Sequence, residues 1–230
     1  MSEYGQDLQS VAQTAVKRAM ELGATGAECT LSEGEEFSVN IRMREVENLK
    51  QAGSRGAGIR VLVGRRTGSS YTSDLSREGM ESMVRAAVNL AEITTEDPHA
   101  GLPDEAELGS IEGDLRLFDP AIPEMEADWK IAQAKRAEEA AFAADARIQN
   151  SEGASFDSNT GARYFASSGG FAGGYRTSSC GLSVVPVAKQ NGSMERDYWY
   201  TNSRSARGLE SAEDVGRRAA ERAVRRLNAR

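Results

Sequence analysis

The chain has 230 residues, of which 39% are hydrophobic and 27% charged, so it is long enough to bury a substantial core in one large domain or two small ones. No stretch approaches the roughly 20 apolar residues that a membrane-spanning helix requires, and residues 1–10 lack the basic-then-apolar order of a signal peptide. These features exclude a helical membrane protein and predict a cytoplasmic one.

The formal net charge of -7 comes from one segment. Residues 95–128 contain eleven Asp or Glu and a single base, Arg116, whereas the rest of the chain has 24 acidic and 27 basic residues. Four of the five prolines also lie in this segment. Such a composition is typical of a long connection. We therefore predict an acidic, proline-rich connection at 95–126 between a first unit at 1–94 and a second unit at 127–230.

The first unit opens with a predicted helix. Apolar residues recur at helical spacing from about Asp7 to Leu22, and Gly23 stands where a helix would end. Strand-like runs separated by Gly, Ser and charged residues follow at 27–33, 37–43, 46–52, 58–64 and 68–73. A second helix begins after Asp74 or Ser76, either of which can cap it. The unit is predicted to be a helix, an antiparallel meander and a helix.

The second unit repeats this order of elements. A helix is predicted at about 127–144, and Ser211 with Asp214 fits the capping box of a final helix. Between them lie strand-like runs at 146–150, 162–168, 171–178, 181–188 and 193–201. Because strands come in runs, the fold class is α+β, with extensive antiparallel sheets flanked by helices. The likeness of the units is one of element order, which leaves open a duplicated helix–strands–helix unit.

Two glycine-rich runs invite a phosphate-loop reading. A phosphate loop presents backbone N–H groups at the start of a helix that follows a strand. The run at 53–58 leads into a strand, and the run at 169–174 lies between two strand-like runs. Both are therefore interpreted as turns or bulges, and neither supports a nucleotide cofactor.

Few residues in the chain suit metal or nucleophilic catalysis. His99 is the single histidine and lies in the acidic connection, where a surface position is expected. Cys29 and Cys180 are far apart and in no ligand-like spacing, so they are interpreted as core residues. A catalytic zinc usually has at least one nitrogen or sulfur ligand, so we predict no zinc site in this chain. Two crowded sets of acids remain, for which solvated charge is the ordinary interpretation: Glu33, Glu35 and Glu36, and Glu124, Glu126 and Asp128.

The end of the chain holds a basic and an aromatic feature. The last helix has five arginines interleaved with acids, so direct nucleic-acid binding is not expected. In the run 197–200, Tyr198 and Tyr200 lie on one side of a predicted strand and Asp197 and Trp199 on the other. One side is expected to face the core, and the other a protein partner or peptide.

Three stretches resemble the TldD/PmbA family. The first comprises ENLKQA at 47–52, GAGIRV at 56–61, GRRTGSSYTSD at 64–74 and the VRAAVNLA helix at 84–91. The second comprises FDP at 118–120 and ADARIQN at 144–150. The third runs from GGY at 173–175 through NGSMERDYWYT at 191–201 to Arg204, and it resembles the PmbA (TldE) branch more than the TldD branch.

The resemblance implies a function. Members of the family are described as modulators of DNA gyrase and as subunits of a two-subunit cytoplasmic zinc peptidase that processes unfolded or leader peptides. The family's zinc ligands come from a His-Glu-x-x-x-His helix and a later cysteine of the TldD subunit, and this chain has no His-Glu pair. The resemblance thus implies the amino-terminal half of a PmbA-type subunit, with zinc in a TldD-type partner and a carboxy-terminal domain missing.

These features define the expected role and its rivals. A non-catalytic domain is expected to form part of the peptide chamber and the subunit interface, with a homo-oligomer as the assembly when the chain is alone. Candidates for the peptide or partner surface are Arg176, Tyr198, Tyr200 and Arg204. The alternatives are a stand-alone protein-binding module without a peptidase role and a carboxylate-based hydrolase.

Overall fold

The computed structural model describes residues 8–104, 107–109 and 113–227. Its helices are α1 (Leu8–Glu21), α2 (Arg77–Ile93), α3 (Ala127–Ala144) and α4 (Ala212–Arg226), with a short 3₁₀ helix, η2 (Ala206–Gly208). Its strands are β1 (Gly26–Arg42), β2 (Glu45–Val63), β3 (Arg66–Thr72), β4 (Ile148–Ser167), β5 (Ala172–Gln190), β6 (Ser193–Arg196) and β7 (Trp199–Ser203). The fold is α+β, as predicted.

The described strands form one seven-stranded sheet in the order β3-β2-β1-β4-β5-β6, with β7 also paired to β5. β3 pairs antiparallel with the end of β2, from Ala57 to Val63. Both β6 and β7 pair antiparallel with β5, at residues 187–190 and 180–184 respectively. β1 and β4 also run antiparallel, because Ala27 bonds with Ser168 whereas Arg42 bonds with Ser151.

Contacts divide the chain into two compact units that share the long strands. Unit 1 takes in the described residues of Met1–Gly34, Ser54–Leu115 and Gly161–Arg176. Unit 2 takes in those of Glu35–Gly53, Arg116–Thr160 and Thr177–Arg230. This grouping reflects proximity in space, whereas the division made from the sequence follows position along the chain. β1, β2, β4 and β5 each contribute residues to both units.

The core of unit 1 lies between helices α1 and α2 and the strands they cover. Ala27, Cys29 and Leu31 alternate along β1 toward this core, and they meet Ile59 and Val61 of β2. The apolar faces of α1 and α2 complete the cluster. The side chain of Ser76 accepts a hydrogen bond from the backbone N–H of Gly79, which confirms it as the N-cap of α2.

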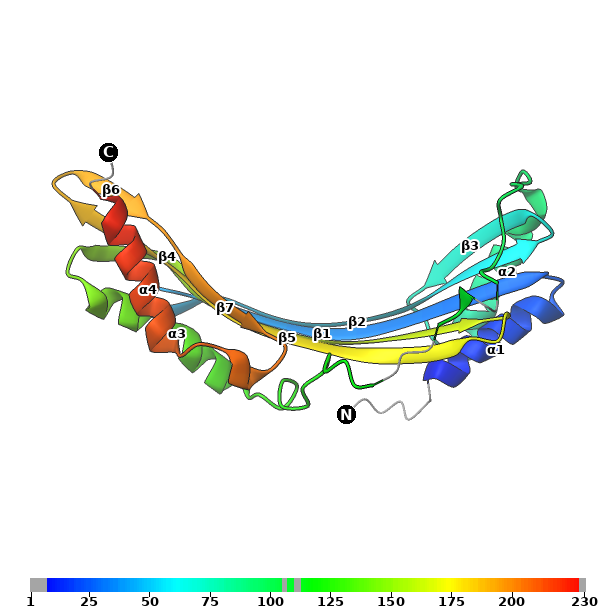
Figure 1. Cartoon of the computed structure of the whole chain (residues 1–230), viewed down its shortest axis with the longest axis horizontal. Helices are drawn as coiled ribbons and strands as arrows, with labels where there is room; N and C mark the ends of the chain where they lie inside the picture. Colours follow the sequence, from blue (N-terminus) through cyan, green and yellow to red (C-terminus); the bar gives the residue numbers. More distant parts are fainter. Residues whose placement is uncertain (1–7, 105–106, 110–112, 228–230) are drawn as a thin grey trace. The chain divides into compact units, whose positions relative to one another are not determined.

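The core of unit 2 lies beneath α3 and α4. Figure 1 shows these helices side by side on the same side of the strands of this unit. Phe156 of β4 and Val184 of β5 are fully buried against them. The buried carboxylate of Glu138 on α3 accepts hydrogen bonds from the backbone N–H groups of Met43 and Arg44 in the β1–β2 turn. The helix thereby holds a turn that belongs to a distant part of the sequence.

The strands are longer than the sequence predicted. The runs expected at 27–33 and 37–43 are both parts of β1, and the glycine-rich run at 53–58, expected to be a turn or bulge, lies within β2. The apolar alternation of β1 lapses at 32–36, where side chains are exposed or partly buried. Backbone pairing does not require apolar side chains, so the strand continues where hydrophobicity alone predicts a break.

Candidate functional site

The candidate site lies on the helix-free face of the sheet in unit 2. Along β4, Ala154, Phe156 and Ser158 are buried toward the helices, so the alternate residues face the other way. β5 follows the same rule, with Cys180 and Leu182 buried toward the helices. The alternation therefore places a set of short and polar side chains on the uncovered face.

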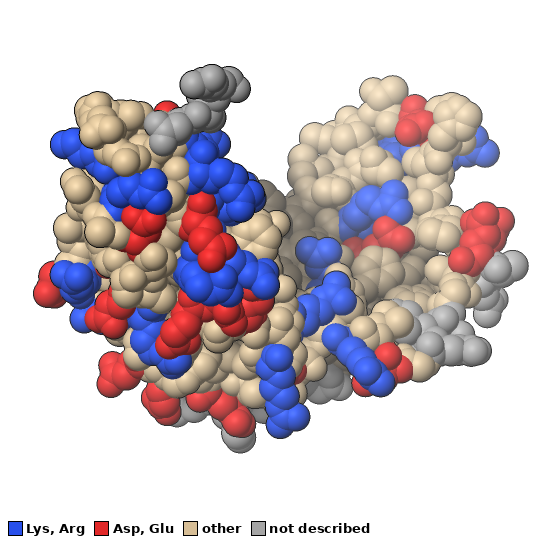
Figure 2. Space-filling model, turned by 60° about the vertical axis from the view of Figure 1, so that its left-hand side comes forward, with Lys and Arg blue, Asp and Glu red and all other residues tan. Residues whose placement is uncertain are grey.

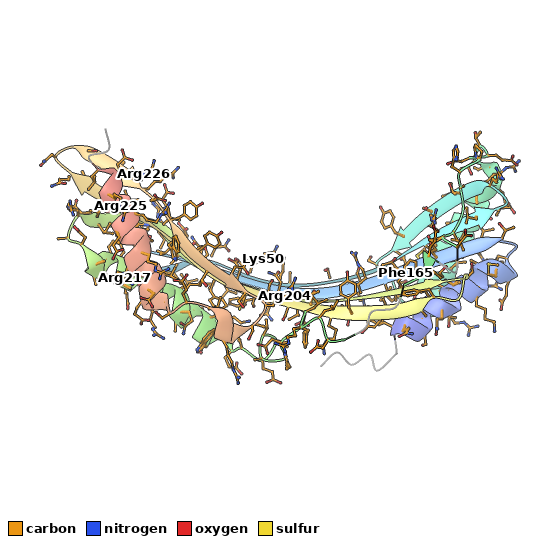
Figure 3. All side chains as sticks on the ribbon, viewed as in Figure 1. Lys50, Phe165, Arg204, Arg217, Arg225 and Arg226 are labelled. Carbon is orange, nitrogen blue, oxygen red and sulfur yellow. The ribbon has the colours of Figure 1, made fainter. Side chains whose placement is uncertain are left out.

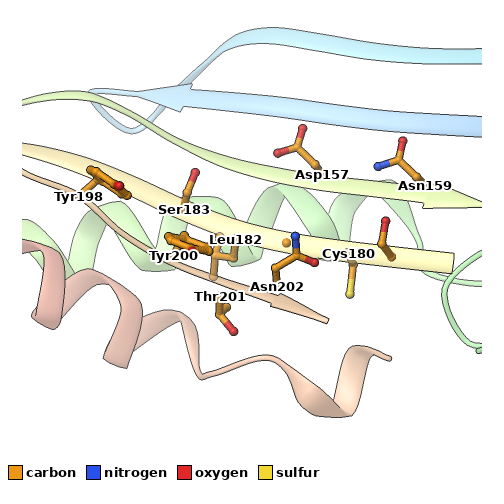
Figure 4. Close-up of a pocket in the computed structure, with 11 residues that line it drawn as sticks. Asp157, Asn159, Cys180, Leu182, Ser183, Tyr198, Tyr200, Thr201 and Asn202 are labelled. Atoms are coloured by element: carbon orange, nitrogen blue, oxygen red, sulfur yellow. The ribbon is translucent and has the colours of Figure 1, made fainter. Parts of the chain in front are cut away.

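A pocket of about 310 Å³ opens on this face. Its residues come from β4, β5 and β7, with Tyr198 immediately before β7: Asp157, Asn159, Ser179, Cys180, Gly181, Leu182, Ser183, Tyr198, Tyr200, Thr201 and Asn202. Figure 4 shows Asp157, Asn159 and Ser183 projecting to the same side of the strands, whereas Cys180 and Thr201 project to the opposite side. The volume is at the lower end of the roughly 300–1,000 Å³ typical of ligand pockets, and it suits one or two side chains of a ligand.

Two tyrosines form one wall of the pocket. The ring centroids of Tyr198 and Tyr200 are 6.2 Å apart with an interplanar angle of 24°, so the rings are stacked. The two residues remain 54% and 57% exposed, which leaves ring surface available to a ligand. On the opposite side of the strand, Trp199 packs against the core of unit 2, with the guanidinium groups of Arg218 and Arg222 over its ring. This division of the aromatic run is the one that strand alternation predicts.

The four residues proposed from the sequence occupy different places. Tyr198 and Tyr200 line the pocket, but Arg176 and Arg204 do not. Arg176 is exposed on the part of β5 that belongs to unit 1. Arg204 follows β7 in unit 2, and its backbone carbonyl accepts a hydrogen bond from the hydroxyl of Ser178. Of the four proposed residues, the structure thus brings together only the two tyrosines in the pocket.

Sequence reasoning missed the residues of β4 and β5 that complete the pocket. Asp157 and Asn159 are separated from Tyr198 by about forty residues, and nothing in their local sequence marks them as polar pocket residues. The usable signal was the period-two spacing of Ser179, Gly181 and Ser183, which places short side chains on one face of a strand. Their meeting with the tyrosines depends on the pairing of β5 with β7.

The described residues do not fit a zinc site. No group of three or more His, Cys, Asp or Glu that could hold a metal ion occurs within residues 8–104, 107–109 and 113–227. His99 is exposed in the connection, and the buried Cys29 and Cys180 belong to different units. We therefore assign no catalytic step of this chain to a bound metal.

The two cysteines are also poor nucleophiles. Burial raises the pKa of the Cys29 thiol to about 12. Burial, and to a smaller extent the negative charge of the nearby Asp119 carboxylate, raises the pKa of the Cys180 thiol to about 11. The thiolate is the reactive form, and these pKa values keep it scarce at neutral pH.

We expect neither cysteine of the folded chain to react appreciably with a disulfide reagent such as DTNB at about pH 8, because the thiols are both protonated and buried. The same reagent should titrate both thiols once the chain is unfolded in guanidinium chloride. Rapid reaction of one thiol in the native chain, with Cys29→Ser and Cys180→Ser variants used to identify it, would contradict this assignment.

The basic stripe of α4 is largely neutralised. Arg217 pairs with Asp214 and Glu221, and further ion pairs join Arg218 to Glu210 and Arg222 to Asp197. Figure 3 places Arg217, Arg225 and Arg226 along this helix. Acidic and basic side chains alternate on the surface of this part of the chain in Figure 2. Such a mixed surface is unlike the uniformly basic surface that phosphate backbones require.

The crowded acids show no catalytic arrangement. Glu33, Glu35 and Glu36 are exposed on β1, and the carboxylate of Glu36 forms an ion pair with Lys50. The second set, Glu124, Glu126 and Asp128, is exposed in the turn before α3 and in its first turn. Solvated charge accounts for both sets.

None of the helices in the described ranges is both long enough and apolar enough to span a membrane.

Comparison with known proteins gives consistent similarities. A family model described as PmbA/TldA metallopeptidase domain 1 matches residues 27–91, and one described as PmbA/TldA metallopeptidase central domain matches residues 120–227. The chain is 40% identical over 225 residues to Metalloprotease PmbA of Escherichia coli O157:H7, covering 96% of this chain and 50% of that protein. It is 35% identical over 223 residues to a Metalloprotease PmbA homolog of Haemophilus influenzae, covering 97% and 49%.

Solved structures show the same likeness. A protein from Bacteroides thetaiotaomicron described as a modulator of DNA gyrase superposes with a TM-score of 0.87 at 26% identity, covering 98% of this chain and 51% of that one. TldE from Thermococcus kodakarensis superposes with a TM-score of 0.80 at 12% identity, covering 93% and 47%, which shows a shared fold. The chain therefore spans about half the length of the relatives that it matches.

Proposed function

Because the chain belongs to the PmbA/TldD metallopeptidase family, we propose that it is the amino-terminal part of a PmbA/TldE-type subunit that acts with a zinc-bearing TldD-type subunit. In this role it forms part of a peptide chamber and of the subunit interface. The substrates are unfolded or leader peptides, and the place of action is the cytoplasm. Hydrolysis belongs to the partner, because the described residues of this chain do not fit a zinc site.

The observation that carries the peptide-binding role is the pocket on the helix-free face of unit 2. An extended peptide projects alternate side chains to opposite sides, so one side chain can enter a pocket between strands while the main chain lies across the sheet. The pocket combines two exposed aromatic rings with several polar groups, a composition that suits peptide recognition. Arg176 and Arg204 remain proposed contacts outside it.

An open strand edge provides a second means of holding a peptide. β3 covers β2 from Ala57 to Val63 and leaves residues 45–53, in unit 2, without an outer neighbour among the described strands. Val46 and Leu49 are exposed on this segment, at 44% and 46%. Unpaired backbone groups of an edge strand can pair with an added strand, with little dependence on the added sequence. Such binding suits a substrate that is defined by being unfolded.

The test is reconstitution with a TldD-type chain. We expect a tagged TldD-type chain to retain this chain in a pull-down, and the mixture to hydrolyse an unstructured peptide. Chelation should abolish hydrolysis and zinc should restore it, whereas this chain alone should be inactive. The TldD-type chain alone and a resin without bait are the controls.

Two results would contradict the proposal. Failure to form a complex, together with no effect on hydrolysis, would remove the peptidase role and leave a stand-alone binding module. Hydrolysis by this chain alone after removal of metal would instead indicate a carboxylate-based hydrolase, and it should then disappear when an acid of one crowded set is replaced.

A further inference from the structure

We propose that the pocket on the helix-free face is a binding site for a guanidinium group, and that it selects an arginine side chain of an extended peptide. This inference rests on the proposed peptide-binding role and names the chemistry of the bound side chain. The features that carry it are the shape of the pocket, its single charge and the position of its aromatic rings.

The shape of the pocket follows from side-chain size along β5. Ser179, Gly181 and Ser183 occupy the helix-free face in succession and form a low floor. Tyr198 and Tyr200 stand along one side of this floor, and Asp157 and Asn159 of β4 stand along the other. A side chain that lies on the floor therefore has aromatic rings on one side and a carboxylate on the other.

The charge of the pocket favours a cation. Asp157 is the one acidic residue among the eleven that line it, and no Lys or Arg is present among them. Asp157 is partly buried, and its side chain forms no ion pair or hydrogen bond with any residue that the structure describes. A partly buried carboxylate without a partner gains most from a positively charged hydrogen-bond donor. Anionic ligands, such as phosphate groups or acidic peptides, would meet the negative charge of Asp157 without any basic residue to offset it.

The aromatic wall favours guanidinium over ammonium. The rings of Tyr198 and Tyr200 are stacked, both residues are more than half exposed, and the face of an aromatic ring attracts cations. A guanidinium group is planar, stacks on aromatic faces and can donate two parallel hydrogen bonds to one carboxylate. An ammonium group is a strongly hydrated point charge, and it would gain less from the rings. The order of affinity should therefore be arginine above lysine, with neutral side chains weaker than both.

The experiment measures binding of blocked pentapeptides to the whole chain by NMR titration. Acetylated and amidated Gly-Gly-X-Gly-Gly peptides carry arginine, lysine or citrulline at X, the last being nearly isosteric with arginine but uncharged. We expect the arginine peptide to shift the backbone amide signals of Gly181 and Asn202 and to bind about tenfold more tightly than the citrulline peptide, a ratio that one charge-assisted hydrogen bond supplies.

Variants identify the group that recognises the charge. Asp157→Asn should weaken binding of the arginine peptide about tenfold and leave binding of the citrulline peptide unchanged. Glu124→Gln removes an exposed carboxylate outside the pocket and should change neither affinity. Tyr200→Leu should weaken both cationic peptides, and arginine more than lysine. A thermal melt of each variant establishes that it is folded.

Three outcomes would overturn the inference. In the first, the arginine and citrulline peptides bind with equal affinity. In the second, Asp157→Asn and Glu124→Gln have the same effect on the affinity for the arginine peptide. In the third, none of the peptides binds. Failure of the arginine site can be distinguished from failure of the proposed peptidase role. A complex with a TldD-type chain that hydrolyses arginine and citrulline peptides equally would remove the arginine site and keep the peptidase role. Arginine-selective binding by a chain that forms no such complex would keep the arginine site and remove the peptidase role.

Discussion

Replacement of Glu138 by alanine is expected to lower the free energy of unfolding by about 3 kcal/mol, because two hydrogen bonds to a buried carboxylate are lost. Its oxygens accept from the backbone N–H groups of Met43 and Arg44, at 3.0 and 2.6 Å. The backbones of these two residues have positive φ values of 51° and 71°, which residues other than glycine and asparagine rarely adopt. The carboxylate therefore stabilises a turn whose own sequence does not favour it.

The adjacent Glu139 provides a matched control. It is exposed on α3, and its side chain forms no ion pair or hydrogen bond within the described part of the chain. Glu139→Ala should change the free energy of unfolding by less than about 0.5 kcal/mol. Urea denaturation followed by circular dichroism measures both variants, and Glu138→Gln, which keeps one acceptor, should fall between them. Equal stability of the two alanine variants would show that the carboxylate does not hold the turn.

Gly216→Val is expected to destabilise unit 2 by about 3 kcal/mol or to prevent its folding, because an added side chain has no room. A Cβ atom at Gly216 would lie 2.2 Å from the backbone oxygen of Ala137 and 2.8 Å from the Cβ of Ala140. Both neighbours belong to α3, and the first is a backbone atom that cannot rotate away. The close approach of α3 and α4 therefore requires glycine at this position.

Arg225→Val is the control for Gly216→Val, since it places valine on the same helix at an exposed position. It carries only the modest cost of a β-branched residue in a helix, about 0.5 kcal/mol. Thermal and urea denaturation of the two variants distinguish steric conflict from helix propensity. Comparable losses of stability would contradict the assignment of Gly216 to close helix packing.

Helices were the most predictable part of the fold. The helix predicted at about 127–144 coincides with α3, and Ser211 is confirmed as the N-cap of α4 by the hydrogen bond that its side chain accepts from the N–H of Asp214. Helical hydrogen bonds, caps and apolar faces are all local in sequence, so a short window contains the information that specifies them. Strand lengths were less predictable, because pairing partners lie far apart in the chain.

One wall of the pocket could be predicted, because the alternation of side chains along a strand is also local in sequence. Alternation within a strand placed Tyr198 and Tyr200 together on an exposed face, and both line the pocket. Asp157 entered only through the position of β4 beside β5, and no local pattern connects it with the tyrosines. Arg176 and Arg204, the other two candidates for the peptide or partner surface, lie outside the pocket.

The sequence by itself determined the fold class, the helices, the family and the scarcity of zinc ligands. Composition can be counted without a structure, and periodicity and motifs are properties of residues that are close together in the chain. The tertiary structure decided that the strand-like runs join into long strands, that Glu138 holds the turn at Met43 and Arg44, and that Asp157 faces two tyrosines. Each of these depends on strand register or on helix packing between segments that are far apart in the chain. Such register and packing are determined by backbone hydrogen bonds and burial that form only when the whole chain folds.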